Sequence, residues 1–567
     1  MRSAQVSRQG FHIEVDHLRK TLAGGARVLD GVTLRIEPGE LVAIVGGSGA
    51  GKTTLLEAIA GIRPADDGHV RFDGVDSYVE QERFRRTLGF VPQDDIIHVE
   101  LPVERTLHYA AQLRMPPTQD EVETDRAVHH ALSVLDLTQR ADVPVGALSG
   151  GQRKRTSIAV ELLTDPRVFF LDEPTSGLDP ATSTHLISLL RRLSDDGRTV
   201  LFTTHSVQDL GSCDQVVFLA PGGRLAYAGT LPDALTHFGV SDPAEIYTLL
   251  AAEDATDRWT ARSNGRSLES PPSSESETAL EAAEPEIAEG PGPLRQWAIL
   301  TRRTFETMVR NRLTLAILLG SPALVVAMFA ILFKPGAFDF ADPSPSATVM
   351  IIFWITFGGF FFGLTYGLLQ ICTELPVLRR ERFVGLNLCS YLMSKVAVLL
   401  PFLLLVVVSM LVVLRGLDRL PSKGLDTYAS LGVTLALNAA AALALGLLTS
   451  AAVSTPAQAT LALPMLCFPA VLFSGAILPV NVMASAGQWV SAVMIDRWAF
   501  EAVGSTLGLR HLFADGGSDL GPPLLKAYGD AGTSSVATYW LILAAFFVVF
   551  LVAAWLTLRR RTATAAR

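Results

Sequence analysis

Residues 46–53 read Gly46-Gly47-Ser48-Gly49-Ala50-Gly51-Lys52-Thr53, directly after the apolar run 41–45 and directly before Thr54-Leu55-Leu56. A glycine-rich loop between a strand and a helix suits phosphate groups, because its backbone N–H groups can wrap them and the helix dipole favours their charge. Lys52 is expected to reach the β and γ phosphates of a nucleotide, and the Thr53 hydroxyl to bind Mg²⁺. A chance glycine-rich turn would rarely have both flanking segments. We therefore predict a nucleotide site formed by Gly46, Gly47, Ser48, Gly49, Gly51, Lys52, Thr53 and Thr54.

The segments around this loop alternate short apolar runs with helical stretches, from about residue 11 to residue 250. The apolar runs 168–171, 200–203 and 216–219 have the length and the β-branched or aromatic residues of buried strands. Alternation of strands and helices is typical of an α/β domain. We expect this domain to occupy residues 1–251.

One of these apolar runs, 168–171, ends in two acids, Asp172 and Glu173. Asp172 is placed to hold Mg²⁺, and Glu173 is placed to orient an attacking water as a general base. Two acids at a strand end are more often solvated or capping residues, but beside a phosphate loop the catalytic interpretation is favoured.

Four further stretches resemble motifs of the ABC transporter superfamily. Residues 148–155, Leu-Ser-Gly-Gly-Gln-Arg-Lys-Arg, are similar to the ABC signature, and residues 174–179, Pro-Thr-Ser-Gly-Leu-Asp, to the D-loop. Gln93 resembles the Q-loop glutamine and His205 the switch histidine, although alone each would be an unremarkable surface amide or strand-end histidine. The resemblance implies an ATPase using ATP and Mg²⁺. It assigns catalytic roles to Glu173, His205 and Gln93, metal ligation to Thr53, Gln93 and Asp172, and nucleotide contacts to Ser149, Gly150, Gly151, Gln152 and Asp179.

One position departs from the family pattern. Many ABC cassettes have an aromatic residue that stacks on adenine before the first glycine-rich strand, and Leu22 or a neighbour takes that place here. The sequence leaves open how the base is held.

The α/β domain is followed by a change of composition. Residues 252–292 are rich in Ser, Pro and Glu, with seven Glu and no Lys or Arg between residues 267 and 292, so we expect a solvated linker. Residues 293–312 carry apolar residues at helical spacing together with arginines, which predicts an amphipathic connecting helix on the membrane surface.

The remainder, 313–567, is predicted to be an all-α membrane domain of six transmembrane helices. Its uncharged runs reach or approach the length of about 20 residues that crosses a bilayer; they are 313–333, 347–372, 396–414, 427–453, 457–480 and 536–558. Arginine clusters at 302–312, 379–382 and 559–561 then fall on one side, which places the cassette and both termini in the cytoplasm. Residues 481–535 become an external loop, and the protein is expected in the cytoplasmic membrane.

Composition excludes other classes. The net charge of −9 argues against a nucleic-acid binder, because contacts to phosphates need a surface rich in Lys and Arg. The four cysteines have no paired spacing, which predicts reduced packing residues, with a metal site as the alternative.

The order of the two domains resembles the ABCG subfamily, as do residues 91–98, 381–385 and 473–480. This resemblance implies a half-transporter that pairs with a second copy of itself or with a related half-transporter, and that exports a hydrophobic or lipid-like substrate through the bilayer. It also implies that residues 374–395 form a coupling loop against the cassette. The alternative from another class is a non-transporting ATP-driven regulator that acts on an external partner. An importer would need separate permease chains.

Overall fold

The computed structural model describes residues 10–22, 24–85, 87–116, 121–251, 259, 290–529 and 531–563. Contacts divide the chain into two compact units. The first contains Met1–Gly292 with Arg379–Leu386 and Ala563–Arg567, and the second contains Pro293–Leu378 with Asn387–Thr562. Most of the predicted linker, 252–292, lies outside the described residues.

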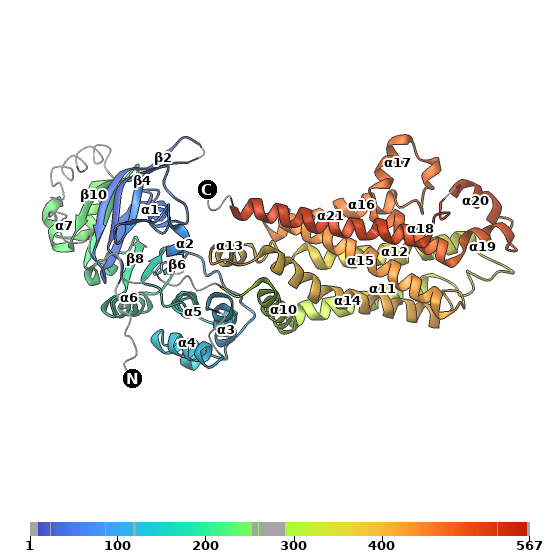
Figure 1. Ribbon diagram of the computed structural model, residues 1–567, viewed down its shortest axis with the longest axis horizontal. Helices are drawn as coiled ribbons and strands as arrows, with labels where there is room; N and C mark the ends of the chain where they lie inside the picture. Colours follow the sequence, from blue (N-terminus) through green and yellow to red (C-terminus); the bar gives the residue numbers. More distant parts are fainter. Residues whose placement is uncertain are drawn as a thin grey trace. The chain divides into compact units, whose positions relative to one another are not determined.

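The first unit is built on two β-sheets (Figure 1). The six-stranded sheet has the order β10-β9-β3-β8-β7-β6, in which β10 is antiparallel to β9 and all other neighbours are parallel. The four-stranded sheet, β2-β1-β4-β5, is antiparallel. The strands are β1 Ile13–Thr21, β2 Arg27–Ile36, β3 Leu41–Gly46, β4 Asp67–Phe72, β5 Val75–Asp76, β6 Leu88–Val91, β7 Val168–Leu171, β8 Thr199–Thr204, β9 Gln215–Ala220 and β10 Arg224–Gly229.

The central strand β3 is buried on both faces, which explains its unbroken apolar sequence. Leu41, Ala43 and Val45 point into one hydrophobic cluster, and Val42 and Ile44 point into the other, as the period of two in a strand requires. Parallel pairing with β8 and β9 fixes the register of β3 and therefore the position at which the phosphate loop begins.

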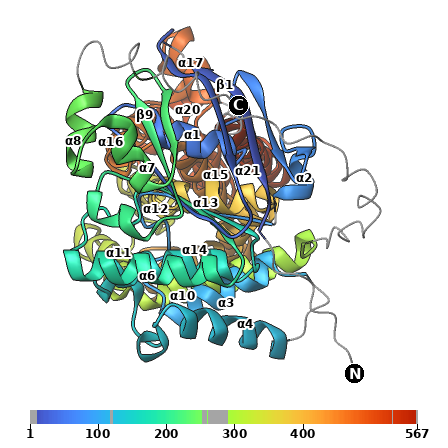
Figure 2. The ribbon, with the colours of Figure 1, turned by 90° about the vertical axis from the view of Figure 1, so that its left-hand side faces the viewer.

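Helices cover both sheets of the first unit. They are α1 Lys52–Ile59, α2 Gln81–Phe84, α3 Val103–Arg114, α4 Glu121–Val134, α5 Gly150–Leu162, α6 Pro180–Asp195, α7 Leu231–Phe238 and α8 Pro243–Leu250. Figures 1 and 2 show α3, α4 and α6 on the same side of the strands. The predicted α/β class of the N-terminal domain is confirmed.

The described part of the second unit is helical. Its helices are α10 Pro293–Arg310, α11 Arg312–Leu332, α12 Pro345–Leu368, α14 Leu388–Gly416, α15 Leu425–Ala452, α16 Pro456–Leu472, α17 Ser485–Ala492, α18 Ile495–Leu507, α19 Leu509–Asp515, α20 Gly521–Tyr528 and α21 Val536–Ala563. One further helix, α13 Leu375–Phe383, begins in this unit and ends in the segment that groups with the first unit.

Glycines let α12 and α15 approach closely. A Cβ added to Gly363 would lie 2.3 Å from the Ala439 backbone oxygen, and one added to Gly367 would lie 2.5 Å from the Leu443 oxygen. Small residues at such positions are how apolar helices in a membrane pack without a hydrophobic driving force between them.

The predicted count of six membrane spans is not confirmed. Among the described residues, α12, α14, α15 and α21 are long and apolar enough to cross a membrane. A fifth candidate is the pair of α10 and Leu315–Phe329, which are bent by 73° at the break between them. The predicted span 457–480 is shorter than expected, because α16 has 17 residues and ends at Leu472, before the turn in which Gly475 has a φ of +81°.

The segment 481–535 contains four helices, α17 to α20 (Figure 1). The longest of them, α18, packs against α12 and α15, so part of this segment belongs to the core of the second unit.

Candidate nucleotide-binding site

The phosphate loop joins the end of β3 to the start of α1. Gly49 and Gly51 have φ angles of +77° and +93°, and a Cβ on Gly51 would lie 2.6 Å from the Val28 backbone oxygen, so the loop requires glycine there. Lys52 Nζ lies within the loop and donates to the Gly46 carbonyl at 3.0 Å. Gly47, Ser48 and Thr54 complete the loop and the first turn, the first two exposed and Thr54 half-buried. Backbone N–H groups and one ammonium therefore gather where phosphates would bind.

The predicted metal ligands Thr53 and Asp172 meet beside the loop. Thr53 Oγ1 donates to Asp172 Oδ1 at 3.0 Å, and Thr203 Oγ1 donates to the same oxygen at 2.6 Å. The buried Asp172 thus connects α1 with the ends of β7 and β8. A hydroxyl and a carboxylate oxygen at this separation suit a small hard cation, so these residues fit Mg²⁺.

The three predicted catalytic residues meet at the Glu173 carboxylate. Gln93 Nε2 donates to Glu173 Oε2 at 3.1 Å, and His205 Nδ1 lies 3.7 Å from the same oxygen. The Glu173 backbone has a φ of +42°, a conformation that non-glycine residues adopt rarely, and its N–H donates to Thr203 Oγ1 at 2.8 Å. Strained residues of this kind concentrate at functional sites.

The predicted signature residues form a separate group at the start of α5. Ser149 Oγ accepts from the Gln152 N–H at 3.4 Å, and Gln152 Oε1 accepts from the Ser149 N–H at 3.1 Å, which is a complete capping box. A Cβ on Gly151 would lie 2.3 Å from Thr182 Cγ2, so α5 and the start of α6 are in close contact, and Gly150 lies at the same end of α5.

Asp179 caps α6 next to this group. Its carboxylate accepts from the Thr182 N–H at 3.0 Å and from the Thr182 hydroxyl at 2.6 Å. These hydrogen bonds lower the pKa of Asp179. The hydrogen bonds described for Ser149, Gln152 and Asp179 stay within this second group, so the predicted site is divided into two groups on one chain.

Sequence reasoning missed Asp209. This buried carboxylate accepts from Thr175 Oγ1 at 2.8 Å and from Thr204 Oγ1 at 2.7 Å. Thr175 lies two residues after Glu173, and Thr204 directly precedes His205. Asp209 therefore ties together the segments that carry two predicted catalytic residues. A single acid in a short 3-10 helix has no sequence pattern that would reveal it.

A second missed residue is Arg380, in the part of α13 that groups with the first unit. Its guanidinium donates to Glu161 Oε1 at 2.6 Å, to the Ser157 carbonyl at 3.1 Å and to the Ile96 carbonyl at 2.9 Å. Arg114 binds the same glutamate at 2.8 Å. Burial alone would raise the pKa of Glu161, but the two guanidinium groups outweigh it and hold that pKa below its ordinary value.

Two family models match the chain, each in one half. The model described as ABC transporter matches residues 29–176, and the model described as ABC-2 type transporter matches residues 295–507. The first match covers the phosphate loop, the start of α5 and Glu173, and the second runs from α10 to the end of α18.

Curated relatives agree with both matches. An ABC transporter ATP-binding/permease protein of Mycobacterium tuberculosis is 34% identical over 508 residues, which is 88% of this chain and 58% of the relative. The broad substrate specificity ATP-binding cassette transporter ABCG2 of Bos taurus is 36% identical over 229 residues, 39% of this chain and 34% of the relative. ABC transporter G family member 32 of Arabidopsis thaliana is 39% identical over 215 residues, 36% of this chain and 15% of the relative. The chain spans less than two thirds of the length of each.

The motifs, the geometry of the phosphate loop and the two matched models are in the same order along the chain. The chain belongs to the ABC transporters, with an N-terminal ATP-binding cassette followed by an ABC-2 type membrane domain.

Proposed function

We propose that the chain is an ATP-hydrolysing half-transporter of the ABCG kind, which dimerises and exports a hydrophobic or lipid-like substrate across the cytoplasmic membrane. The observation that carries the proposal is the division of the predicted ATP site. The side-chain hydrogen bonds described for Ser149 and Gln152 stay at the start of α5 and do not reach the phosphate loop or Glu173. Lys154, further along α5, donates to the Gln93 carbonyl at 2.6 Å. A second chain would bring its signature group to this phosphate loop, and twofold symmetry would complete both sites.

Hydrolysis at such a site would use the residues already grouped there. Mg²⁺ held by Thr53 and Asp172 would neutralise charge on the phosphates when bound. Glu173 would orient the attacking water and accept its proton, while Gln93 donates to one carboxylate oxygen and His205 lies 3.7 Å from the same oxygen. The signature N–H groups of the second chain would contribute the electrostatic stabilisation that a helix N-terminus offers to a γ-phosphate.

Arg380 supports coupling of this chemistry to the membrane domain. Its guanidinium contacts α5, which starts with the signature group, and Ile96, three residues after Gln93. Movement of either element on ATP binding would therefore act on α13, and α13 continues through residues 384–387 into α14.

An apolar substrate is supported by the composition of α12. Trp354, Phe357 and Phe361 are half-buried and follow one another, with ring centroids 5.9 and 6.2 Å apart. We propose that this row lines the substrate path, whereas the buried Phe353 and Phe360 pack inside the unit.

Inside-out vesicles test the proposal. Vesicles containing the intact protein or Glu173→Gln are supplied with a lipid and metabolite extract and ATP, and their contents are analysed by mass spectrometry. Glu173→Gln should bind ATP but hydrolyse it about 10²–10⁴ times more slowly, because a general base contributes about that factor. Apolar compounds that accumulate only with the intact protein support export, and ATP hydrolysis without accumulation of any compound contradicts it.

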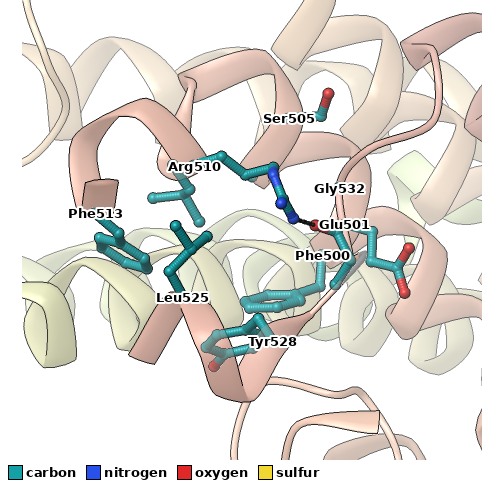
Figure 3. Close-up of a pocket in the computed structure, with 11 residues that line it drawn as sticks. Phe500, Glu501, Ser505, Arg510, Phe513, Leu525, Tyr528 and Gly532 are labelled. Carbon is teal, nitrogen blue, oxygen red and sulfur yellow. Dashed lines mark hydrogen bonds between the residues drawn. The ribbon is translucent and has the colours of Figure 1, made fainter. Parts of the chain in front are cut away.

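The second candidate function is an ATP-driven regulator of an external partner. It is favoured by the helices α17 to α20, which the segment 481–535 forms. A small cavity of about 40 Å³ lies among α18, α19 and α20, and Figure 3 shows Phe513, Leu525 and Tyr528 around it. Arg510 closes one side by donating to the carbonyls of Gly529 and Ala531. A structured external surface of this kind could recognise a partner. The vesicle experiment separates the two functions.

A further inference from the structure

Asp496 is a carboxyl group buried in the interior of the membrane domain. It is the second residue of α18 and follows the stretch 427–495, which contains no Asp, Glu, Lys, Arg or His. Its side chain is fully buried. Among the described residues, neither of its carboxyl oxygens has a hydrogen-bond donor.

Asn438 lies next to this carboxyl and also has an unsatisfied oxygen. The Asn438 amide N–H approaches the Asp496 carboxyl. The same nitrogen, Nδ2, also donates to the Thr356 carbonyl at 2.7 Å. Asn438 Oδ1 is buried and has no donor in the described part of the chain. Asp496 and Asn438 therefore present three buried acceptor oxygens, none of which has a donor within hydrogen-bond distance among the described residues.

The pair lies deep in the membrane domain. Asn438 is half-way along α15, and Thr356 is half-way along α12, and both helices are long enough to span a membrane. The neighbours of Asp496 on α18, Ile495 and Ala499, belong to an apolar cluster formed with α12, α15, α16 and α21. An ionisable group at this depth is costly when charged and is a functional-site candidate.

The charged and titratable groups around Asp496 do not neutralise it. Arg497 binds Glu501 at 3.0 Å and lies over the Trp498 ring at 4.5 Å. Tyr539 of α21 donates to the other oxygen of Glu501 at 3.2 Å. On α16, the Cys467 thiol is a titratable group near Asp496. Thr356 of α12 and Asn438 of α15, which are joined by a hydrogen bond of 2.7 Å, carry no charge.

We propose that Asp496 and Asn438 form a proton-binding site in the middle of the membrane domain, in which a neutral Asp496 donates its O–H to Asn438 Oδ1. Uptake forms one O–H bond on the carboxylate, with the proton taken from hydronium, which leaves water. The proton turns one of the three acceptors into a donor and removes a bare charge from an apolar interior. A metal cation is a poorer match, because hard cations take about six oxygen ligands and these two residues supply three.

Infrared spectroscopy of the full chain in lipid bilayers at neutral pH tests the site without relying on transport. The intact protein should show the C=O band of a protonated carboxyl with a shift in heavy water, and Asp496→Asn should lose that band. Asp515→Asn, on the exposed side of α19, is the matched control and should keep it. Asn438→Leu should move the band instead of removing it, because the acid remains and its acceptor is gone.

Two results would overturn the proposal. One is a spectrum in which the intact protein and Asp496→Asn have the same carboxyl region, since Asp496 would then be ionised. The other is a band that appears only when sodium is replaced by choline, which would make the pair a sodium site. Because none of these readouts needs ATP or a substrate, failure of the proposed export would leave the test of the proton site intact.

Discussion

The Glu173 carboxylate and backbone are both restrained by neighbouring residues in the absence of substrate. Gln93 and His205 approach one oxygen, and the strained backbone at φ +42° is held by a hydrogen bond to Thr203. A strained backbone conformation costs on the order of 1–3 kcal/mol and persists only when surrounding contacts enforce it. Asp209 supplies such contacts, because it fixes the threonines beside Glu173 and His205.

Replacing Asp209 should therefore reduce turnover without weakening nucleotide binding. We expect Asp209→Ala to lower kcat by about tenfold, because looser positioning of Glu173 and His205 that raises the barrier by about 1.4 kcal/mol gives that factor. KM for ATP should stay unchanged, because the hydrogen bonds described for Asp209 go to Thr175 and Thr204 and not to the phosphate loop. Steady-state ATPase assays give both constants. Combining Asp209→Ala with Thr175→Val should cost less than the sum of the single effects, because the two residues share one hydrogen bond. Strict additivity would contradict the assigned link.

Thiol labelling tests the packing behind Asp209. Burial, with smaller contributions from the charges of Asp209 and Asp214, raises the pKa of the Cys213 thiol to about 12. At pH 8 the reactive thiolate is on the order of 1 in 10,000, so Cys213 should resist maleimide until the pH is far higher or the cassette unfolds. Cys389 is exposed and should be labelled readily. Peptide mass mapping identifies the site, and rapid labelling of native Cys213 at pH 8 would refute the buried environment.

At the scale of elements, the short helix α13 makes several buried polar contacts through one side chain, Arg380. Nine residues place one guanidinium against a glutamate of α5 and a carbonyl that follows the Q-loop. Glu161 is shared by Arg380 and Arg114, so the cluster is a buried network and not a surface ion pair.

Arg380→Ala should uncouple ATP hydrolysis from transport and destabilise the cassette. Removing one partner of a buried ion pair costs about 3–5 kcal/mol, and the lower end applies here because Arg114 remains. Calorimetry measures the loss of stability, and vesicle transport per ATP hydrolysed measures the uncoupling. Arg192→Ala removes an exposed arginine 3.5 Å from Asp136 and should change neither. Equal effects of the two substitutions would contradict a coupling role.

The same network predicts a dependence on pH. The folded cassette holds the pKa of Glu161 below its ordinary value of 4.5, so the stabilisation is fully present above that value and is lost as the pH falls through the lower folded value. Because Arg380→Ala removes one of the two guanidinium groups, it should weaken this acid-dependent loss. Thermal unfolding between pH 7 and pH 3, a range chosen to bracket the ordinary carboxyl pKa, compares the two proteins.

The elements that the sequence predicts well are those governed by local pattern, and the errors have identifiable causes. The strand, loop and helix around Lys52 follow directly from glycine and apolar residues. A search for uncharged runs starts the third span at 396, but α14 starts at Leu388, where the Asn387 side chain caps it. The helix includes the buried Lys395, whose charge is paired with Glu374 at 2.6 Å. The sequence shows the charge, and only the fold shows its partner.

At the scale of the whole molecule, the sequence predicts two domains and the order of the motifs, but not the residues that connect distant segments. Asp209, Arg380 and Asp496 act through partners in other elements, and nothing in their local sequence indicates those partners. The prediction of a loop over residues 481–535 misses α18, the helix that carries Asp496. A helix of 13 residues is too short to be recognised as a membrane span.

Complementation tests whether two chains build each ATP site. Lys52→Ala disables the phosphate loop, and Ser149→Arg places a bulky cation at the start of α5, so each variant alone should lack ATPase activity. In a mixed dimer, the intact phosphate loop of the Ser149→Arg chain meets the intact signature of the Lys52→Ala chain, which restores one of the two sites. Random mixing makes half of the dimers mixed, so co-expression should recover about a quarter of the wild-type sites. If each chain completed its own site, the mixture would stay as inactive as either variant, and the division of the site into two groups would have no functional meaning.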